Sequence, residues 1–342
     1  MKTPLLCFEP APRNLLLALI LSLTLCGALG QTAYEPGKRY FGRSNYVEYI
    51  AGDMPLIISA PHGGALKPAD VPDRKHGEFT SDAYTEELAR TVQQVFHNYF
   101  GHHPCVISCR LDRRKLDCNR DLEEGAGDDP GARQAWQDYH GFIETARSNV
   151  LATTGKGFYI DLHGQSNPIK RVELGYCLTE RQLTNADTIL NQPAYAGRST
   201  IRALAQRTSL PFAELLRGSS SFGALLAAKG YPAVPSPAMP HPGLGNSYFD
   251  GGYKVRHHCS ANGSAIDGLQ MEVNYAGVRD TAVNRTNFSL ALAQVMDSFF
   301  RNHYRLDLRT GAAPPDNAAR PADLRTDSSR PPVQPSSAGR SL

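Results

Sequence analysis

Polar residues able to carry out hydrolytic chemistry follow or end four short apolar runs of this sequence. His62 follows LIISAP, His163 follows FYIDL, and Glu272 ends GLQME. The fourth run, CVISCRLDRRKL, leads into Asp117-Cys118-Asn119-Arg120. Because open α/β sheets build their sites at the carboxyl ends of strands, we expect these residues to meet at one edge of a sheet. Two imidazoles, several carboxylates and an arginine are the groups that a one-metal hydrolase uses.

The two histidines are the first candidates for metal ligands. His62 is followed by two glycines, which permit positive φ and a close approach of the backbone. His163 repeats this arrangement, and Asp161, two residues earlier on the same strand face, is placed to orient its ring. Catalytic zinc takes three protein ligands and keeps one position for water. Asp82 is our choice for the third ligand and Glu78 is the alternative, whereas without a metal Asp82 would only cap a helix.

Glu272 and two arginines are candidates for the remaining steps. Gln270 and Glu272 share one face of an apolar strand, where a buried glutamate is unfavourable unless something uses it. A general base beside a metal-activated water is the simplest use. Asn119-Arg120 lies in a basic segment, and an arginine fork is able to hold a substrate carboxylate. Arg256 and His257 are further candidates for contacts with the substrate.

Strands and helices alternate through the part of the chain that contains these residues. The expected strands are 55–61, 105–111, 157–162, 172–178, 231–234, 252–257 and 268–274. The expected helices are 82–99, 130–152, 198–209, 219–229 and 281–301. This alternation predicts an α/β fold with helices on both faces of a mixed, mostly parallel sheet.

The two ends of the chain differ in composition from this core. Residues 1–30 contain a short apolar run behind basic residues and end in small residues, which is typical of a signal peptide cleaved near Gly30/Gln31. We therefore expect a secreted or periplasmic protein that has no membrane anchor after cleavage. Residues 309–342 are rich in Pro, Ala, Ser and Arg, which predicts a disordered tail. Residues 31–308 remain as one catalytic domain.

The charge of the chain narrows the choice of binding partners. The formal net charge is +3. Residues 1–30 carry Lys and Arg against one Glu, and 309–342 carry five Arg against three Asp, so the core is near neutral. Without a basic patch, nucleic acid and membrane surfaces are not expected as partners.

The core contains five cysteines, which in an exported chain permit up to two disulfides. They are Cys105, Cys109, Cys118, Cys177 and Cys259.

Five motifs, taken in their order, resemble those of the N-formylglutamate amidohydrolase family, which belongs to the zinc carboxypeptidase and aspartoacylase superfamily. The resemblance runs from about Pro55 to Phe300. The motifs are Pro-His-Gly-Gly at 61–64, Asp-x-Asn-Arg at 117–120, Asp-x-His-Gly at 161–164, Gly-Gly-Tyr-x-x-Arg-His at 251–257 and Leu-Gln-x-Glu at 269–272. It implies a carboxypeptidase-like three-layer α/β/α sandwich.

The same resemblance implies roles for individual residues. One zinc ion per chain would be held by His62, an acidic residue and His163, with Glu272 as the base. Asn119-Arg120 would clamp the substrate carboxylate. The resemblance also implies Arg256 as a second anion contact and Arg113 as the group that polarises the scissile carbonyl. The superfamily's usual His-x-x-Glu pair is absent, since Ala65 stands at the glutamate position, so Asp82 or Glu78 has to replace it.

We therefore expect a secreted zinc-dependent amidohydrolase that cleaves the amide bond of an N-formyl or N-acyl amino acid. Its substrate would be a small carboxylate similar to N-formylglutamate. One rival is an extracellular metallopeptidase that trims C-terminal residues or cell-wall peptides. The other is an inactive protein that keeps the fold and binds a carboxylate. Polar residues at every expected site position argue against this second rival.

Overall fold

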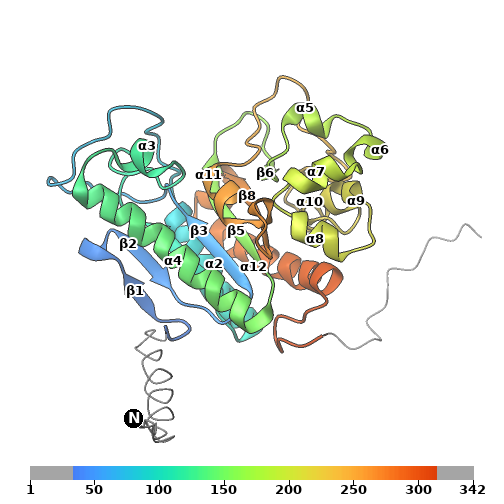
Figure 1. The fold of residues 1–342 in the computed structure, drawn as a ribbon, viewed down its shortest axis with the longest axis horizontal. Helices are drawn as coiled ribbons and strands as arrows, with labels where there is room; N and C mark the ends of the chain where they lie inside the picture. Colours follow the sequence, from blue (N-terminus) through green and yellow to red (C-terminus); the bar gives the residue numbers. More distant parts are fainter. Residues whose placement is uncertain (1–33, 314–342) are drawn as a thin grey trace, which may run out of the picture.

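The computed structural model describes residues 34–313, which build one eight-stranded sheet (Figure 1). The strand order is β1-β2-β4-β3-β5-β8-β6-β7. The strands are β1 (Arg39–Phe41), β2 (Val47–Ile50), β3 (Leu56–Ala60), β4 (Cys105–Cys109), β5 (Gly157–Gln165), β6 (Val172–Gly175), β7 (Ala233–Val234) and β8 (Ile266–Asn274). The predicted signal peptide at 1–30 and residues 314–342 of the predicted tail lie outside the described residues.

Four neighbouring strands in the middle of the sheet, β4, β3, β5 and β8, run parallel to one another. The pairs β1/β2, β2/β4 and β6/β8 are antiparallel, and β6/β7 is parallel. Four of the seven pairings are thus parallel, which confirms the prediction of a mixed, mostly parallel sheet. The central strands are buried on both faces, and this explains why they appear in the sequence as continuous apolar runs.

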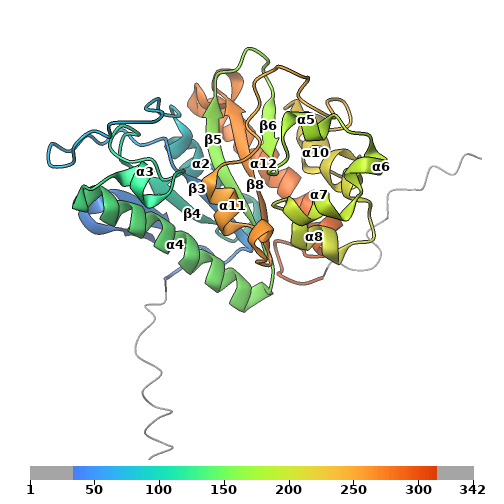
Figure 2. The same cartoon turned by 45° about the horizontal axis from the view of Figure 1, so that its top comes forward.

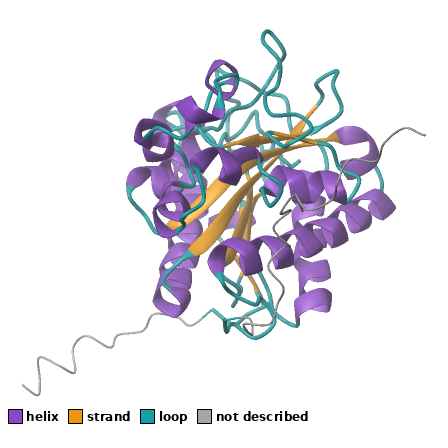
Figure 3. Cartoon of the chain, turned by 90° about the vertical axis from the view of Figure 1, so that its right-hand side faces the viewer, coloured by secondary structure: helices purple, strands orange, loops and turns teal. Residues whose placement is uncertain are grey.

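Helices cover both faces of the sheet, as Figures 2 and 3 show. On one face α2 (Thr85–Phe100) packs on the sheet and against α12 (Ala282–Phe299). On the other face lie α4 (Pro130–Thr154) and α11 (Tyr253–His258). Each face of the sheet packs against its helices in a hydrophobic core, and alternate residues of β3 point into the two cores. Ile58 packs on the α2 side and Ile57 on the α4 side. The predicted three-layer α/β/α arrangement is confirmed.

The long helices form where the sequence carries an apolar stripe and suitable ends. Helix α4 begins at Pro130, and the Asp129 carboxylate caps it by accepting the backbone N–H of Ala132 at 2.7 Å. It ends before Gly155, which takes a left-handed φ of 68°. Helix α2 buries one stripe formed by Leu88, Val92 and Phe96. No helix within residues 34–313 is long and apolar enough to cross a membrane.

Short helices fill the long connection between β6 and β7 and gather beyond that edge of the sheet (Figure 1). They are α5 (Glu180–Leu183), α6 (Asp187–Leu190), α7 (Pro193–Arg198), α8 (Arg202–Arg207), α9 (Phe212–Arg217) and α10 (Phe222–Ala228). Within the range 198–209, which was predicted as one helix, the structure has the last residue of α7 and the shorter helix α8. Ser199 has extended backbone angles and separates α7 from α8.

The strand predicted at 252–257 is also wrong, because this segment forms helix α11. Its buried residues, Lys254, Val255 and His258, follow helical spacing, and the lysine among them hid the buried face from the sequence pattern. Strands β1 and β2 were absent from the sequence-based prediction. They are short, and a buried Glu48 interrupts the apolar pattern of β2; it is paired with Arg39 and Arg90.

The five cysteines of the core are free thiols, and all of them are buried. The disulfides that the sequence permits are therefore not formed in this structure. Burial raises the pKa of Cys105 to about 11 and also raises the pKa of Cys177 to about 11. Because the thiolate is the nucleophilic form, Cys105 and Cys177 are weakly nucleophilic and serve as packing groups.

Candidate active site

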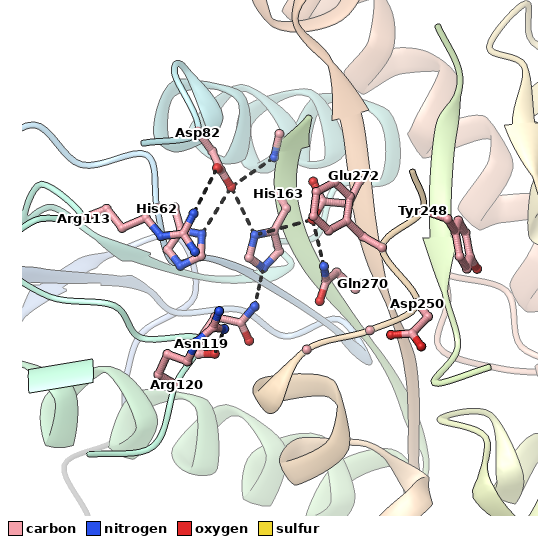
Figure 4. Close-up of a pocket in the computed structure, with 14 residues that line it drawn as sticks. His62, Asp82, Arg113, Asn119, Arg120, His163, Tyr248, Asp250, Gln270 and Glu272 are labelled. Carbon is pink, nitrogen blue, oxygen red and sulfur yellow. Dashed lines mark hydrogen bonds and ion pairs between the residues drawn. The ribbon is translucent and has the colours of Figure 1, made fainter. Parts of the chain in front are cut away.

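A cavity of about 260 Å³ opens at the carboxyl ends of β3, β5 and β8 (Figure 4). Its lining residues come from segments that are far apart in the sequence. They are His62, Asp82, Arg113, Asn119, Arg120, His163, Gly164, Tyr248, Phe249, Asp250, Gly251, Gly252, Gln270 and Glu272. The structure thus brings together seven of the nine residues that the sequence analysis assigned to the site, and leaves Arg256 and His257 outside the lining.

His62 lies two residues beyond the end of β3, at a point where the chain is closely packed. A Cβ on Gly64 would lie 2.2 Å from the carbonyl carbon of Arg110, and one on Gly63 would lie 2.4 Å from the backbone nitrogen of Glu86. Neither glycine has a positive φ. Close approach, and not a left-handed conformation, is therefore what requires the two glycines.

Asp82 directs its carboxylate toward both histidines. Its Oδ2 lies 3.1 Å from Nδ1 of His163 and 3.4 Å from Nδ1 of His62. Helix α2 begins three residues later with Tyr84 as its N-terminal cap residue, so Asp82 does not have the capping role considered as its alternative. Glu78, the other candidate ligand, is exposed, and its carboxylate accepts the backbone N–H groups of the two residues that follow it.

The other ring nitrogen of each histidine faces a buried carboxylate. Nε2 of His62 lies 2.7 Å from Oδ1 of Asp117, and Nε2 of His163 lies 3.1 Å from Oδ2 of Asp161. Such carboxylates behind metal-binding histidines fix the orientation of the ring and the nitrogen that binds. Strand alternation predicts the place of Asp161, whereas no local pattern of the sequence indicates the contact of Asp117 with His62.

Negative charge surrounds the two histidines. Burial opposes a positive charge on His163, but the carboxylates of Asp161 and Glu272 outweigh this effect and raise its pKa to about 10. Burial also opposes the ionisation of Asp82, yet the two imidazoles lower the pKa of its carboxyl group. The metal-free cluster therefore holds a proton on His163. A divalent cation would replace that proton, as metals do when they bind to titratable ligands.

The two Nδ1 atoms and an oxygen of Asp82 fit a metal ion. One donor atom from each of His62, Asp82 and His163 lies within 4.8 Å of the other two. Nδ1 of His62 is buried and has no hydrogen-bond partner within residues 34–313, which is unfavourable unless something else binds it. Ligands bound at about 2.0–2.1 Å to a tetrahedral ion are roughly 3.3 Å apart, similar to the 3.4 and 3.1 Å that separate Oδ2 of Asp82 from the two nitrogens.

Strand β8 places Glu272 next to His163 of β5, since these two residues are paired in the sheet. Oε1 of Glu272 lies 3.9 Å from Nδ1 of His163 and accepts a hydrogen bond of 2.8 Å from Nε2 of Gln270. Burial raises the pKa of Glu272 to about 7, against the opposing effect of His163. A carboxyl group that titrates near neutrality is able to accept a proton and return it.

Arg113, Asn119 and Arg120, which follow β4 in the chain, line the cavity (Figure 4). Arg113 is held by Asp117, to which its Nε donates at 3.0 Å. Arg120 is half-buried and donates to Asn119 O at 2.9 Å. Nδ2 of Asn119 lies 3.3 Å from Nε2 of His163. This wall offers positive charge and N–H donors to an anionic group of a ligand.

Arg256 and His257 are exposed on α11 and do not line the cavity, in contrast to their predicted contacts with the substrate. Nη2 of Arg256 lies 3.7 Å from the carboxylate of Asp250. The ring of His257 stacks on that of Tyr253, with 5.4 Å between the centroids. The physical reason is the helical conformation of this segment, which turns Lys254 inward and the two predicted residues outward.

Two buried cations near the site were not found in the sequence. Arg279 donates to the backbone carbonyls of Gln165 at 3.2 Å and Val273 at 3.3 Å, and so ties together the ends of β5 and β8. Its guanidinium carbon would lie 2.3 Å from a Cβ on Gly164, which explains that glycine. Lys254 contacts Asp161, the carboxylate beside His163. The one feature of the sequence that could have indicated Lys254 is its position among the buried residues of a helix.

Comparisons with known proteins give similarity in structure alone. No protein-family model matches the sequence, and no curated protein matches it. An N-formylglutamate amidohydrolase from Ralstonia eutropha JMP134 has a TM-score of 0.45 at 14% identity, over 79% of this chain and 98% of that chain. A gene product from Agrobacterium tumefaciens has a TM-score of 0.41 at 14% identity, over 75% and 95% of the two chains.

A third solved structure is a protein from Shewanella amazonensis SB2B, provisionally described as a metallopeptidase. It has a TM-score of 0.30 at 13% identity, over 84% of this chain and 91% of that chain. The structures similar to this chain thus include a member of the family that its motifs resemble. At these scores the likeness carries no conclusion about activity, which has to be derived from the residues of this chain.

Proposed function

We propose that this protein is a zinc-dependent hydrolase that cleaves the amide bond of an N-formyl or N-acyl amino acid. One observation carries the proposal: three buried donors, from His62, His163 and Asp82, converge beside Glu272, a buried glutamate whose pKa is about 7. Two imidazoles and one carboxylate form a ligand set of catalytic zinc, which keeps a further position for water.

The residues around the donors supply the other steps of such a hydrolysis. When bound, zinc acidifies a water molecule and polarises a carbonyl group. Glu272 takes the proton from the attacking water and delivers it to the leaving nitrogen, for which a pKa near neutrality is suitable. Arg113 lines the cavity with its Nη1 4.0 Å from Asp82, where it is able to donate to the developing oxyanion.

Size and charge of the cavity support a small carboxylate as substrate. Ligand pockets for drug-sized molecules usually measure about 300–1,000 Å³, and this cavity, at about 260 Å³, lies just below that range. A derivative of a single amino acid fits such a volume better than a peptide does, which favours an amidohydrolase over a peptidase. Asn119 and Arg120 would bind the α-carboxylate and hold the scissile bond near the metal.

Metal analysis combined with a substrate panel tests this function. We expect about one zinc per full-length chain, and hydrolysis of N-formyl or N-acetyl amino acids that is lost when the α-carboxylate is converted to an amide. Faster cleavage of the C-terminal residue from peptides would favour the peptidase. If the zinc-loaded protein binds N-acyl amino acids but does not hydrolyse them, the result would support an inactive carboxylate-binding protein.

We also propose that residues 1–30 direct export and are then removed. The proposal rests on the apolar run and the small residues that precede Gln31. N-terminal sequencing of the protein recovered from its native host would find Gln31 first. Recovery of the intact terminus from the cytoplasm would contradict this proposal without affecting the proposed chemistry.

Arg120 provides a prediction about substrate binding. Replacing Arg120 by alanine removes one charge-assisted contact with the substrate carboxylate, so we expect KM to rise about 10- to 100-fold. The matched control is Arg256→Ala, because Arg256 is an exposed arginine outside the cavity and its loss should leave KM within about twofold. Steady-state kinetics on the best substrate of the panel would measure both, and equal effects of the two changes would contradict the assigned clamp.

A further inference from the structure

We propose that Lys254 is a positioning residue for the metal site. It holds Asp161 in place so that Asp161 accepts a hydrogen bond from Nε2 of His163. The Nδ1 atom of His163 is then free to bind the metal. The inference rests on the proposed metal site, although not on any particular substrate. Lys254 touches neither the cavity nor the donor atoms, and it acts through its neighbour.

The ammonium group of Lys254 is fully buried and has a complete set of acceptors. Its Nζ lies 2.5 Å from Oδ1 of Asp161, 3.2 Å from Oγ of Ser59 and 3.0 Å from the hydroxyl of Tyr139. An ammonium group has three N–H bonds, so each of them meets one oxygen. These acceptors come from β5, β3 and α4, and Lys254 itself lies on α11. The direction of the ammonium group is therefore fixed from several sides.

Asp161 divides its two oxygens between Lys254 and His163. Oδ1 faces the ammonium group, and Oδ2 lies 3.1 Å from Nε2 of His163. This Oδ2 is buried and has no well-aligned hydrogen-bond partner within residues 34–313, so it is free to accept one from Nε2. A buried carboxylate oxygen requires a donor, and the N–H of His163 is the one within reach. Because Lys254 holds Oδ1, the carboxylate is not free to rotate away from the imidazole.

The backbone of Lys254 orients the second neighbour of the same nitrogen. Its N–H donates to Oδ1 of Asn119 at 3.2 Å, which turns the amide so that Nδ2 lies 3.3 Å from Nε2 of His163. A carboxylate accepts hydrogen bonds and an amide NH₂ group only donates them. Asn119 therefore donates to Nε2 only while this nitrogen is unprotonated, and only Asp161 is able to accept a proton from it. A metal ion on Nδ1 would select the tautomer in which Nε2 donates to Asp161. With Nε2 protonated, the neutral ring offers its lone pair at Nδ1, on the side of Asp82.

Other buried ion pairs of the chain show what a purely structural role looks like. Arg171 pairs with Glu173 in the neighbouring strand, and neither residue contacts a metal donor. A buried pair of this kind affects folding, since losing one partner leaves a charge without compensation. A positioning role for Lys254 requires in addition that metal affinity changes. The two roles can therefore be separated by measuring metal binding and stability on the same variants.

The test measures the dissociation constant of Zn²⁺ for the full-length chain by competition with a chelator, and the urea unfolding of the metal-free protein. We expect both Lys254→Met and Asp161→Asn to weaken zinc binding about 10- to 100-fold, the usual effect of losing a partner behind a metal ligand. The double variant should be no weaker than the worse single variant, because both changes break the same hydrogen bond. The matched control, Lys156→Met, removes a half-buried lysine that donates to Tyr304 O, away from the site, and should change zinc affinity less than twofold.

Unchanged zinc affinity in Lys254→Met, with lower stability, would make Lys254 a structural residue and overturn the proposal. If Lys254→Met does not fold, the imidazole ¹⁵N spectrum of the zinc-bound wild type decides the question. Zinc on Nδ1 of His163 with a proton on Nε2 supports the proposal, and zinc on Nε2 overturns it. A wild type that binds zinc in this way without hydrolysing any substrate would refute the proposed function and leave this inference intact.

Discussion

Replacing Glu272 by glutamine is expected to lower kcat about 10²- to 10⁴-fold while zinc remains bound, because general acid–base catalysis contributes a factor of this size. The amide of glutamine fills the same space as the carboxylate but accepts no proton. Glu272 is not among the three donors of the metal site, so the zinc content should stay near that of the wild type. The measurement is steady-state hydrolysis together with metal analysis of the same preparation.

The matched control for this change is Glu87→Gln. Glu87 is exposed on α2, close in sequence to Asp82, and it does not line the cavity. Its replacement should leave kcat within about twofold, as surface substitutions usually do. Full activity in Glu272→Gln, with zinc in place, would show that another group transfers the proton and would remove Glu272 from the mechanism.

The second large effect is expected at the metal donors. Replacing His62 or His163 by alanine removes one of the donors, and we expect the zinc content to fall from about one per chain to less than about 0.1. The melting temperature of the wild type should rise on addition of zinc, because a ligand that binds only the folded chain stabilises it, whereas the variants should not respond. Metal analysis and thermal unfolding with and without zinc measure these effects.

Two comparisons make this test specific. His257→Ala removes an exposed histidine outside the cavity and should keep the full zinc content. Asp82→Ala should behave like the histidine variants, while Glu78→Ala should not, because only Asp82 lies beside both Nδ1 atoms. Retention of zinc in Asp82→Ala and its loss in Glu78→Ala would reverse our assignment of the third ligand.

The sequence predicts those features that follow from local pattern and strand ends. Apolar runs marked the four central strands, and polar residues at their carboxyl ends proved to be neighbours in space, as His62 and His163 show. Alternation along β8 correctly placed Gln270 and Glu272 on one face, where they are hydrogen-bonded to each other. These successes share one cause, because strand geometry determines the direction of a side chain from its position in the sequence.

The errors arise where tertiary contacts decide the structure. The buried face of the short helix α11 includes a lysine and a histidine, which hid its helical pattern, and this misplaced Arg256 and His257. The contact between Lys254 and Asp161 joins residues that are distant in sequence and carry no shared motif. Similarly, Asp117 could be seen as part of a motif, but its contact with His62 depends on the path of the chain between β4 and α3 (Leu122–Ala126).

Because His163 and Glu272 are paired residues on neighbouring strands, their separation is set by the backbone ladder of the sheet, in which strands lie about 4.8 Å apart. The residues proposed to face the substrate, in contrast, stand on connections such as 113–120 and 248–252. Mutations of Arg120 or of residues 248–252 should therefore alter substrate preference while His163 and Glu272 keep their spacing. An engineer who wants a new specificity should randomise these positions and keep Arg113 and Asp117, because Asp117 contacts both His62 and Arg113.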